Sequence, residues 1–159
     1  MARGHGARAG VSAAIWNPPC SALQLLGEQG LWAYELQSTV RAGFPSPAED
    51  FQAKRIDVLE RLVKHPQATY CMTVRGESMS EAGIFDGDVL LVDRAVKPAH
   101  GQIVVAVVDG EFTCNQLWLR AGLLKLKAAN PTFADITPSE GQTVEIWGVV
   151  IGSVRQFKR

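Results

Sequence analysis

A serine beside a tight turn is the first residue of this sequence whose surroundings suggest chemistry. Ser78 lies in the string Gly-Glu-Ser-Met at 76–79, which follows a predicted strand at 70–74. A serine in such a turn can act as a nucleophile, provided that a neighbouring base removes its proton. No Ser/His/Asp arrangement is evident, and loop serines more often hydrogen-bond to the backbone. Taken alone, the string favours a structural role for Ser78.

Other residue types that support catalysis or metal binding are scattered along the chain. The three cysteines and three histidines show no ligand spacing, so neither a zinc site nor a disulfide framework is predicted, and no cofactor is implied. The 16 basic residues balance the 16 acidic ones, which excludes a general attraction to nucleic acid or anionic membranes. No apolar run reaches the ~18 residues that span a bilayer. The cytoplasm is therefore the expected compartment.

Composition divides the chain into three segments. Residues 1–19 are rich in Gly, Ala and Arg and are predicted to form a flexible tail. Residues 20–68 are predicted to form an arm, in which two prolines at 45 and 47 enforce extended backbone. Acidic residues followed by apolar residues at near-helical spacing predict a short helix near 48–64. Residues 69–159 are predicted to form the main domain.

The main domain is predicted to consist of β-strands. Apolar strands bounded by Gly and Pro are expected at 70–74, 88–93, 102–108, 111–119, 123–127 and 144–154. Asp109-Gly110, between two of these strands, is a strong signal for a two-residue hairpin. Because no helix separates the strands, the fold class is mostly β, as a compact antiparallel and partly barrel-like domain.

Several strings, in this order, resemble the peptidase domain shared by LexA repressors and UmuD proteins. They are GESM at 76–79, GIFDGD at 83–88, VVAVVDGEFT at 104–113 and VEIWGVVI at 144–151. Another string, GFPSPA at 43–48, resembles the segment just after the self-cleavage site of UmuD proteins. The resemblance covers about residues 30–157, and it is closer to the UmuD type than to the LexA type.

This resemblance implies an activity and a set of partners. In the family, a Ser–Lys dyad cuts the protein's own N-terminal arm, and RecA filaments on single-stranded DNA promote the cut during the SOS response. The shortened product, a homodimer, joins a UmuC-like subunit to form a translesion DNA polymerase. Carried over to this sequence, the nucleophile is Ser78 and the scissile bond is Ala42–Gly43. Sequence-specific DNA binding and membrane association are not implied.

The position of the family's general base departs from the family pattern. The family has lysine directly after Glu-Phe-Thr-x, whereas here Asn115 follows Glu111 to Cys114. A lysine held neutral takes the serine proton, but an amide can only hydrogen-bond. Losing a general base removes about 10²–10⁴ in rate, so self-cleavage is predicted to be weak or absent. Three alternatives are open: another lysine (Lys97, Lys125 or Lys127) replaces the base, a partner cuts the chain in trans, or the chain is a natural or engineered base variant that keeps the uncut form.

The sequence also predicts the direction of the Cys114 side chain and the roles of two nearby tryptophans. If Asn115 faces the cleft, Cys114 faces away from it and into the core, because neighbouring strand residues point to opposite faces. Trp118 and Trp147 are interpreted as core or dimer-interface aromatics, and no stacking platform for bases is predicted.

Two functional hypotheses follow for the chain as a whole. One is a self-cleaving peptidase of the UmuD type, and the other is a non-catalytic dimeric subunit that binds and regulates the polymerase. A dimer is expected because the edge strands of a small β domain need cover. A LexA-like repressor is disfavoured because it needs an N-terminal helix-turn-helix of some 60–70 residues. The lack of a membrane anchor disfavours a signal peptidase.

Overall fold

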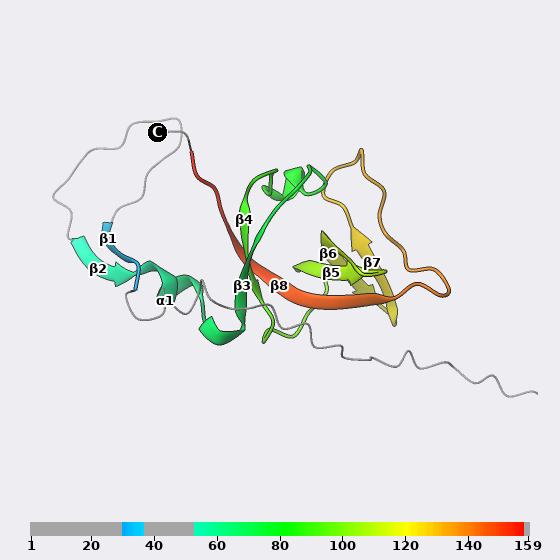
Figure 1. Cartoon of the computed structure of the whole chain (residues 1–159), viewed down its shortest axis with the longest axis horizontal. Coiled ribbons are helices and arrows are strands. Elements are labelled where there is room, and N and C mark those ends of the chain that lie inside the picture. Colours follow the sequence, from blue (N-terminus) through cyan, green and yellow to red (C-terminus); the bar gives the residue numbers. More distant parts are fainter. Residues whose placement is uncertain (1–29, 37–52, 158–159) are drawn as a thin grey trace, which may run out of the picture.

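The computed structural model describes residues 30–36 and 53–157 and is built mainly from antiparallel strands (Figure 1). Within these residues, six strands form one sheet in the order β3-β4-β8-β5-β6-β7. Their bounds differ from the predicted ones by at most one residue: β3 Thr69–Thr73, β4 Val89–Asp93, β5 Ile103–Val108, β6 Glu111–Arg120, β7 Leu123–Lys127 and β8 Val144–Val154. The mostly β, antiparallel prediction is confirmed. In the described part of the chain the sheet stays open, with β3 and β7 at its ends, and does not close into a barrel.

The sheet buries side chains on both of its faces, which explains the continuous apolar run of β5. Val104 and Ala106 belong to one core cluster and Val105 to the other, as expected for alternating strand residues. Strand β8 joins the two halves, because its end pairs with β4 and its start pairs with β5. In Figure 1, β8 runs across the molecule as one long orange-red ribbon. A register shift in each of these pairings indicates a bulge, a feature that bends strands.

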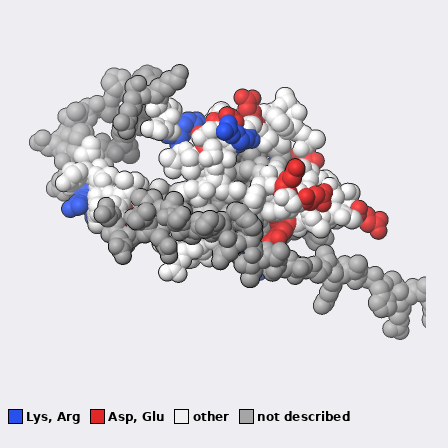
Figure 2. All heavy atoms as spheres, in the orientation of Figure 1, with Lys and Arg blue, Asp and Glu red and all other residues white. Residues whose placement is uncertain are grey.

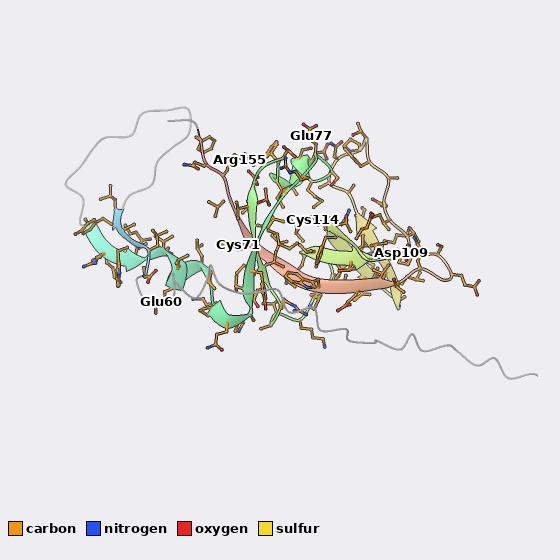
Figure 3. All side chains as sticks on the ribbon, viewed as in Figure 1. Glu60, Cys71, Glu77, Asp109, Cys114 and Arg155 are labelled. Atoms are coloured by element: carbon orange, nitrogen blue, oxygen red, sulfur yellow. The ribbon has the colours of Figure 1, made fainter. Side chains whose placement is uncertain are left out.

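The predicted hairpin between β5 and β6 is confirmed. Asp109 and Gly110 have φ angles of 49° and 90°, the left-handed pair that a tight hairpin turn requires. The Asp109 carboxylate accepts hydrogen bonds from Thr143 N and Gln142 Nε2, both at 3.0 Å. These bonds fasten the turn to the loop before β8, at the right-hand end of the molecule in Figure 3. On the face drawn in Figure 2, acidic side chains gather at this end.

The arm differs from its prediction. Strand β1 (Trp32–Leu36) pairs with β2 (Ala53–Asp57), and the helix α1 covers Val58–Leu62. The helix predicted near 48–64 is therefore shorter than expected, since 53–57 is a strand and 48–52 lies outside the described residues. Strand pairing with a distant segment outweighs the local helical spacing. The Arg55 guanidinium carbon lies 4.5 Å from the centroid of the Trp32 ring and adds a cross-strand contact.

The short helix α1 is bounded by identifiable signals. Asp57 caps its start, since Oδ1 accepts hydrogen bonds from Leu59 N and Glu60 N at 2.9 and 3.3 Å. His65 precedes a proline, which disfavours helical backbone. The His65 ring nitrogen Nδ1 lies 2.7 Å from Asp93 Oδ2 and connects the arm to β4. In the described part of the chain, no helix has the length and apolar character needed to cross a membrane.

Candidate active site

The turn that carries Ser78 begins where β3 ends. Gly76 has a φ angle of 93°, which glycine adopts without strain. Its backbone N–H donates a hydrogen bond to Asp86 Oδ1 at 2.8 Å. On the other side of Ser78, the Met79 side chain is buried in the core. The half-buried Ser78 is therefore held between a hydrogen-bonded turn and an apolar anchor.

The loop after β7 holds the same turn from a second direction. Ala129 N donates a 2.8 Å hydrogen bond to Ser78 O, and Glu81 N donates one of 2.8 Å to Ala129 O. The Asn130 side chain donates from Nδ2 to Glu77 O at 2.9 Å. Glu77 marks this turn at the top of the molecule in Figure 3. Sequence reasoning missed Asn130, because Asn-Pro predicts a turn without revealing what the turn contacts.

The end of β8 supplies a third attachment. Arg155 donates from Nε and Nη2 to both carboxylate oxygens of buried Asp88, at 2.7 and 2.6 Å. Arg155 Nη2 also donates to Gly83 O at 2.9 Å. The hydrogen bonds from Arg155, followed by one from Phe85 N, lower the pKa of Asp88 to about 2. The segment just after Ser78 is thereby tied to the C-terminal end of β8, the strand that pairs with β4.

Ser78 lines a cavity of about 300 Å³. One wall is the end of β3 and the turn that follows it, from Met72 to Gly76. The opposite wall is the start of β6, with Phe112, Thr113 and Cys114. Apolar core residues complete the lining: Met79, Leu90 and Val105. The cavity therefore presents a serine hydroxyl among mainly apolar side chains.

Within the described residues, the cavity lining contains no side chain that takes a proton at neutral pH. Its titratable members are Arg75 and Cys114. Arginine remains protonated in proteins, and burial raises the pKa of the Cys114 thiol to about 11. The Ser78 hydroxyl makes no hydrogen bond to any described residue. The arrangement offers a candidate nucleophile that lacks an activating base.

Asn115 lies beside this cavity without lining it. The side chain is 3% exposed, and its Oδ1 accepts a 2.7 Å hydrogen bond from Thr113 Oγ1. Because Thr113 lines the cavity, the Asn115 amide lies one hydrogen bond from the cavity wall.

Cys114 takes part in two environments. It packs against the core cluster that contains Val105, as the sequence predicted, but it also lines the Ser78 cavity. In Figure 3 it lies below the turn marked by Glu77. The expected core packing of Cys114 is confirmed. Its position away from the cleft is expected only if Asn115 faces the cleft, and here Cys114 lines the cavity whereas Asn115 does not.

The other predicted residues lie elsewhere. Lys97 is exposed after β4, the Lys125 ammonium lies 5.7 Å from the centroid of the Trp118 ring, and Lys127 lines a separate cavity. Lys97, Lys125 and Lys127 are all absent from the lining of the Ser78 cavity. Trp147 is buried and packs against Tyr70, which confirms the core interpretation. The predicted cleavage site Ala42–Gly43 lies outside the described residues.

Comparison with known proteins assigns this chain to a family. A family model described as Peptidase S24-like matches residues 35–151. The chain belongs to the S24-like peptidases. The S24-like family is one of serine peptidases that cleave themselves, so the predicted family chemistry is confirmed at that level.

Individual relatives narrow the assignment within the S24-like peptidases. The chain is 44% identical to MucA of Salmonella typhimurium over 117 residues, which are 72% of this chain and 79% of MucA. It is 43% identical to ImpA of Shigella flexneri over 111 residues, 69% of this chain and 74% of ImpA. It is 38% identical to SamA of Salmonella typhimurium over 117 residues, 74% of this chain and 81% of SamA. These are relatives of the UmuD type, and the predicted UmuD-like SOS mutagenesis protein is confirmed.

Proposed function

We propose that this protein is an accessory subunit of a UmuC-like translesion DNA polymerase, and that its Ser78 site is disabled for self-cleavage. One observation supports the proposed loss of self-cleavage. Among the described residues that line the Ser78 cavity, no side chain takes a proton at neutral pH. Removing a general base costs about 10²–10⁴ in rate. A slow self-cleavage would fall below detection after such a loss.

Asn115 supplies the reason for the missing base. It stands where the family pattern places lysine, and its amide is already engaged with the Thr113 hydroxyl. An amide has no basic lone pair in the useful pH range. The protein therefore acts chiefly in its uncut form, and Ser78 remains as part of an incomplete dyad.

The partners follow from the UmuD-like relationship. We expect a cytoplasmic homodimer that contacts RecA filaments on single-stranded DNA and a UmuC-like polymerase subunit. Large exposed apolar side chains on β1 support a dimer, since Trp32, Tyr34 and Leu36 are 54%, 73% and 52% exposed. Apolar groups gathered on one short strand are typical of an interface.

A second candidate function is a self-cleaving peptidase that cuts at Ala42–Gly43 despite Asn115. Family membership and the position of Ser78 in a cavity between two strand ends favour this candidate. It requires a base from outside the described cavity, such as a partner's side chain or a distant lysine of this chain.

Intact-mass spectrometry of the full chain separates the two candidates. The protein is measured before and after incubation with RecA, a nucleotide and single-stranded DNA, with a self-cleaving relative in the same mixture as a positive control. The proposal predicts an unchanged mass while the relative is cut. A new species matching residues 43–159, lost in Ser78→Ala, would establish the peptidase instead.

A further inference from the structure

Another concave surface lies at the opposite end of β6 from the Ser78 cavity. Its volume is about 290 Å³, and the side chains that matter for its chemistry are His100, Gln116, Trp118, Arg120 and Lys127. Its lining comes from the second half of β6, from the end of β7 and from the loop before β5. Neither the family's peptidase chemistry nor the Ser78 cavity uses these residues.

Strand geometry arranges these side chains in two rows. Gln116, Trp118 and Arg120 alternate along β6 and therefore share one face. On β7, Lys127 pairs with Gln116 and Lys125 pairs with Trp118. The two lysines thus flank the β6 row on the same face, about 6.6 Å apart along the strand. We refer to Gln116, Trp118, Arg120, Lys125 and Lys127 as the β6–β7 basic face.

The cations of this face have no acidic partner in the described part of the chain. Arg120, Lys125 and Lys127 take part in none of its ion pairs. The nearest acidic residue along the neighbouring segment is Asp135, next to Ile136, which bridges β7. The Asp135 carboxylate accepts a hydrogen bond from Ala128 N at 3.2 Å. The face therefore carries three cations outside the ion pairs of the described residues, one of them beside the Trp118 ring.

The indole is held in place and half-exposed. The Lys125 ammonium lies 5.7 Å from the centroid of the Trp118 ring. The His100 ring meets the same ring edge-on, with 6.3 Å between the centroids. His100 is itself fixed, because its Nδ1 accepts a 3.0 Å hydrogen bond from Leu119 N. A ligand that suits this face carries both negative charge and a flat ring.

We propose that the β6–β7 basic face binds single-stranded nucleic acid without sequence preference. Phosphates contact Arg120, Lys125 and Lys127, and one base stacks on Trp118 as the mobile Lys125 ammonium turns to a phosphate. Cations beside an aromatic ring are the usual means of binding single strands. A duplex keeps its bases inside the stack, and an acidic peptide of Asp and Glu has no ring for Trp118. Because the net charge of the chain is zero, the affinity is that of non-specific binding, with a Kd of about 10⁻⁴–10⁻⁶ M at physiological salt.

Fluorescence anisotropy with a labelled oligothymidine tests this proposal on the full chain. For three phosphate contacts, a plot of the logarithm of the association constant against the logarithm of the salt concentration should have a slope of about −2. The double variant Lys125→Gln/Lys127→Gln should bring the slope to about −0.7, the value for one contact. Trp118→Leu should weaken binding about fivefold or more. Arg120→Gln, at an exposed position, should reduce the slope by about 0.7 with no effect on the core.

A matched control distinguishes a site from general charge. Lys54→Gln/Lys64→Gln removes the same charge from exposed positions on the arm and should leave the Kd within about twofold. The proposal is overturned if the wild type does not bind the oligothymidine at low salt. It is also overturned if this control weakens binding as much as Lys125→Gln/Lys127→Gln does. Equal binding of a duplex, or of polyglutamate, would also overturn it. Circular dichroism and sedimentation confirm that each variant is folded before its Kd is used.

Discussion

The two ends of β6 present different chemistry on the same face of one strand. Near the β5–β6 turn, Phe112 and Cys114 line the cavity that contains Ser78. Further along, Trp118 and Arg120 line a concave surface flanked by lysines. Asn115 lies between the two, and its amide oxygen accepts a hydrogen bond from the hydroxyl of Thr113, which lines the Ser78 cavity.

The proposed loss of self-cleavage leaves the architecture around Ser78 intact. The turn that carries Ser78 is held by backbone hydrogen bonds, by Asn130 and by the Asp88–Arg155 pair, and none of these contacts depends on Asn115. An amide at that position is buried and hydrogen-bonded, so it imposes no unsatisfied polar group on the sheet. The proposed loss falls on the proton acceptor alone.

Asn115→Lys is expected to have the largest effect of the substitutions considered, and the quantity that it changes is the rate of self-cleavage. A lysine buried beside the Ser78 cavity is held neutral by desolvation and can take the serine proton. Self-cleavage in the presence of RecA filaments should rise by about 10²–10⁴, as measured by intact mass over time. Asn115→Gln should stay uncut, and adding Ser78→Ala to Asn115→Lys should abolish the gain. A folded Asn115→Lys variant that remains uncut would show that the base position is assigned wrongly.

Leu117 and Leu119 test the burial pattern of the strand between the two sites. Leu117 is 2% exposed and Leu119 is 41% exposed. Leu117→Ala should lower the free energy of unfolding by about 2–5 kcal/mol, because it leaves a cavity in the core. Leu119→Ala should change it by less than about 0.5 kcal/mol. Urea denaturation gives both values, and equal costs would contradict the difference in burial between these two positions.

Asp88→Asn probes the attachment of the serine turn through the pH dependence of stability. The pKa of Asp88 is lowered to about 2 in the folded protein, against about 3.9 for an unperturbed aspartate. The carboxylate therefore contributes stability above about pH 4, and this contribution is lost as the pH falls towards 2. The stability difference between wild type and Asp88→Asn should shrink across that interval in denaturation series at fixed pH. A difference independent of pH would contradict the role of the Asp88 charge.

Gly110→Ala is expected to have the smallest of these effects. The φ angle of Gly110 is 90°, and an added Cβ meets no atom within 4 Å, so the cost is backbone strain of about 1–2 kcal/mol. Gly152→Ala is the matched control, since its Cβ would make an ordinary 3.8 Å contact with Leu91. Thermal denaturation should separate the two variants. A stability loss in Gly152→Ala as large as in Gly110→Ala would argue against turn strain.

The sequence predicts the strands well because their signals are local. Apolar runs bounded by turn residues, together with Asp109-Gly110, defined the six strands of the described sheet to within one residue. The arm shows where local signals fail. The residues of β2 have helical spacing, but they form a strand because Trp32–Leu36 lies alongside them.

The candidate site could be predicted in part. Ser78 and the departure at Asn115 come from motifs in the sequence. The cavity position of Cys114, the hydrogen bond from Asn130 to the serine turn and the cations around Trp118 depend on which strands become neighbours. No spacing along the chain reveals those contacts.

The central claim is that Ser78 lacks a base, and a pH series of the wild-type chain without RecA tests it most directly. Intact mass is followed from about pH 7 to about pH 11, with Ser78→Ala alongside. The account predicts no cutting that depends on Ser78 at any pH in this range. Cutting that requires Ser78, rises with pH and then levels off would reveal a titrating base. Such cutting would contradict the account.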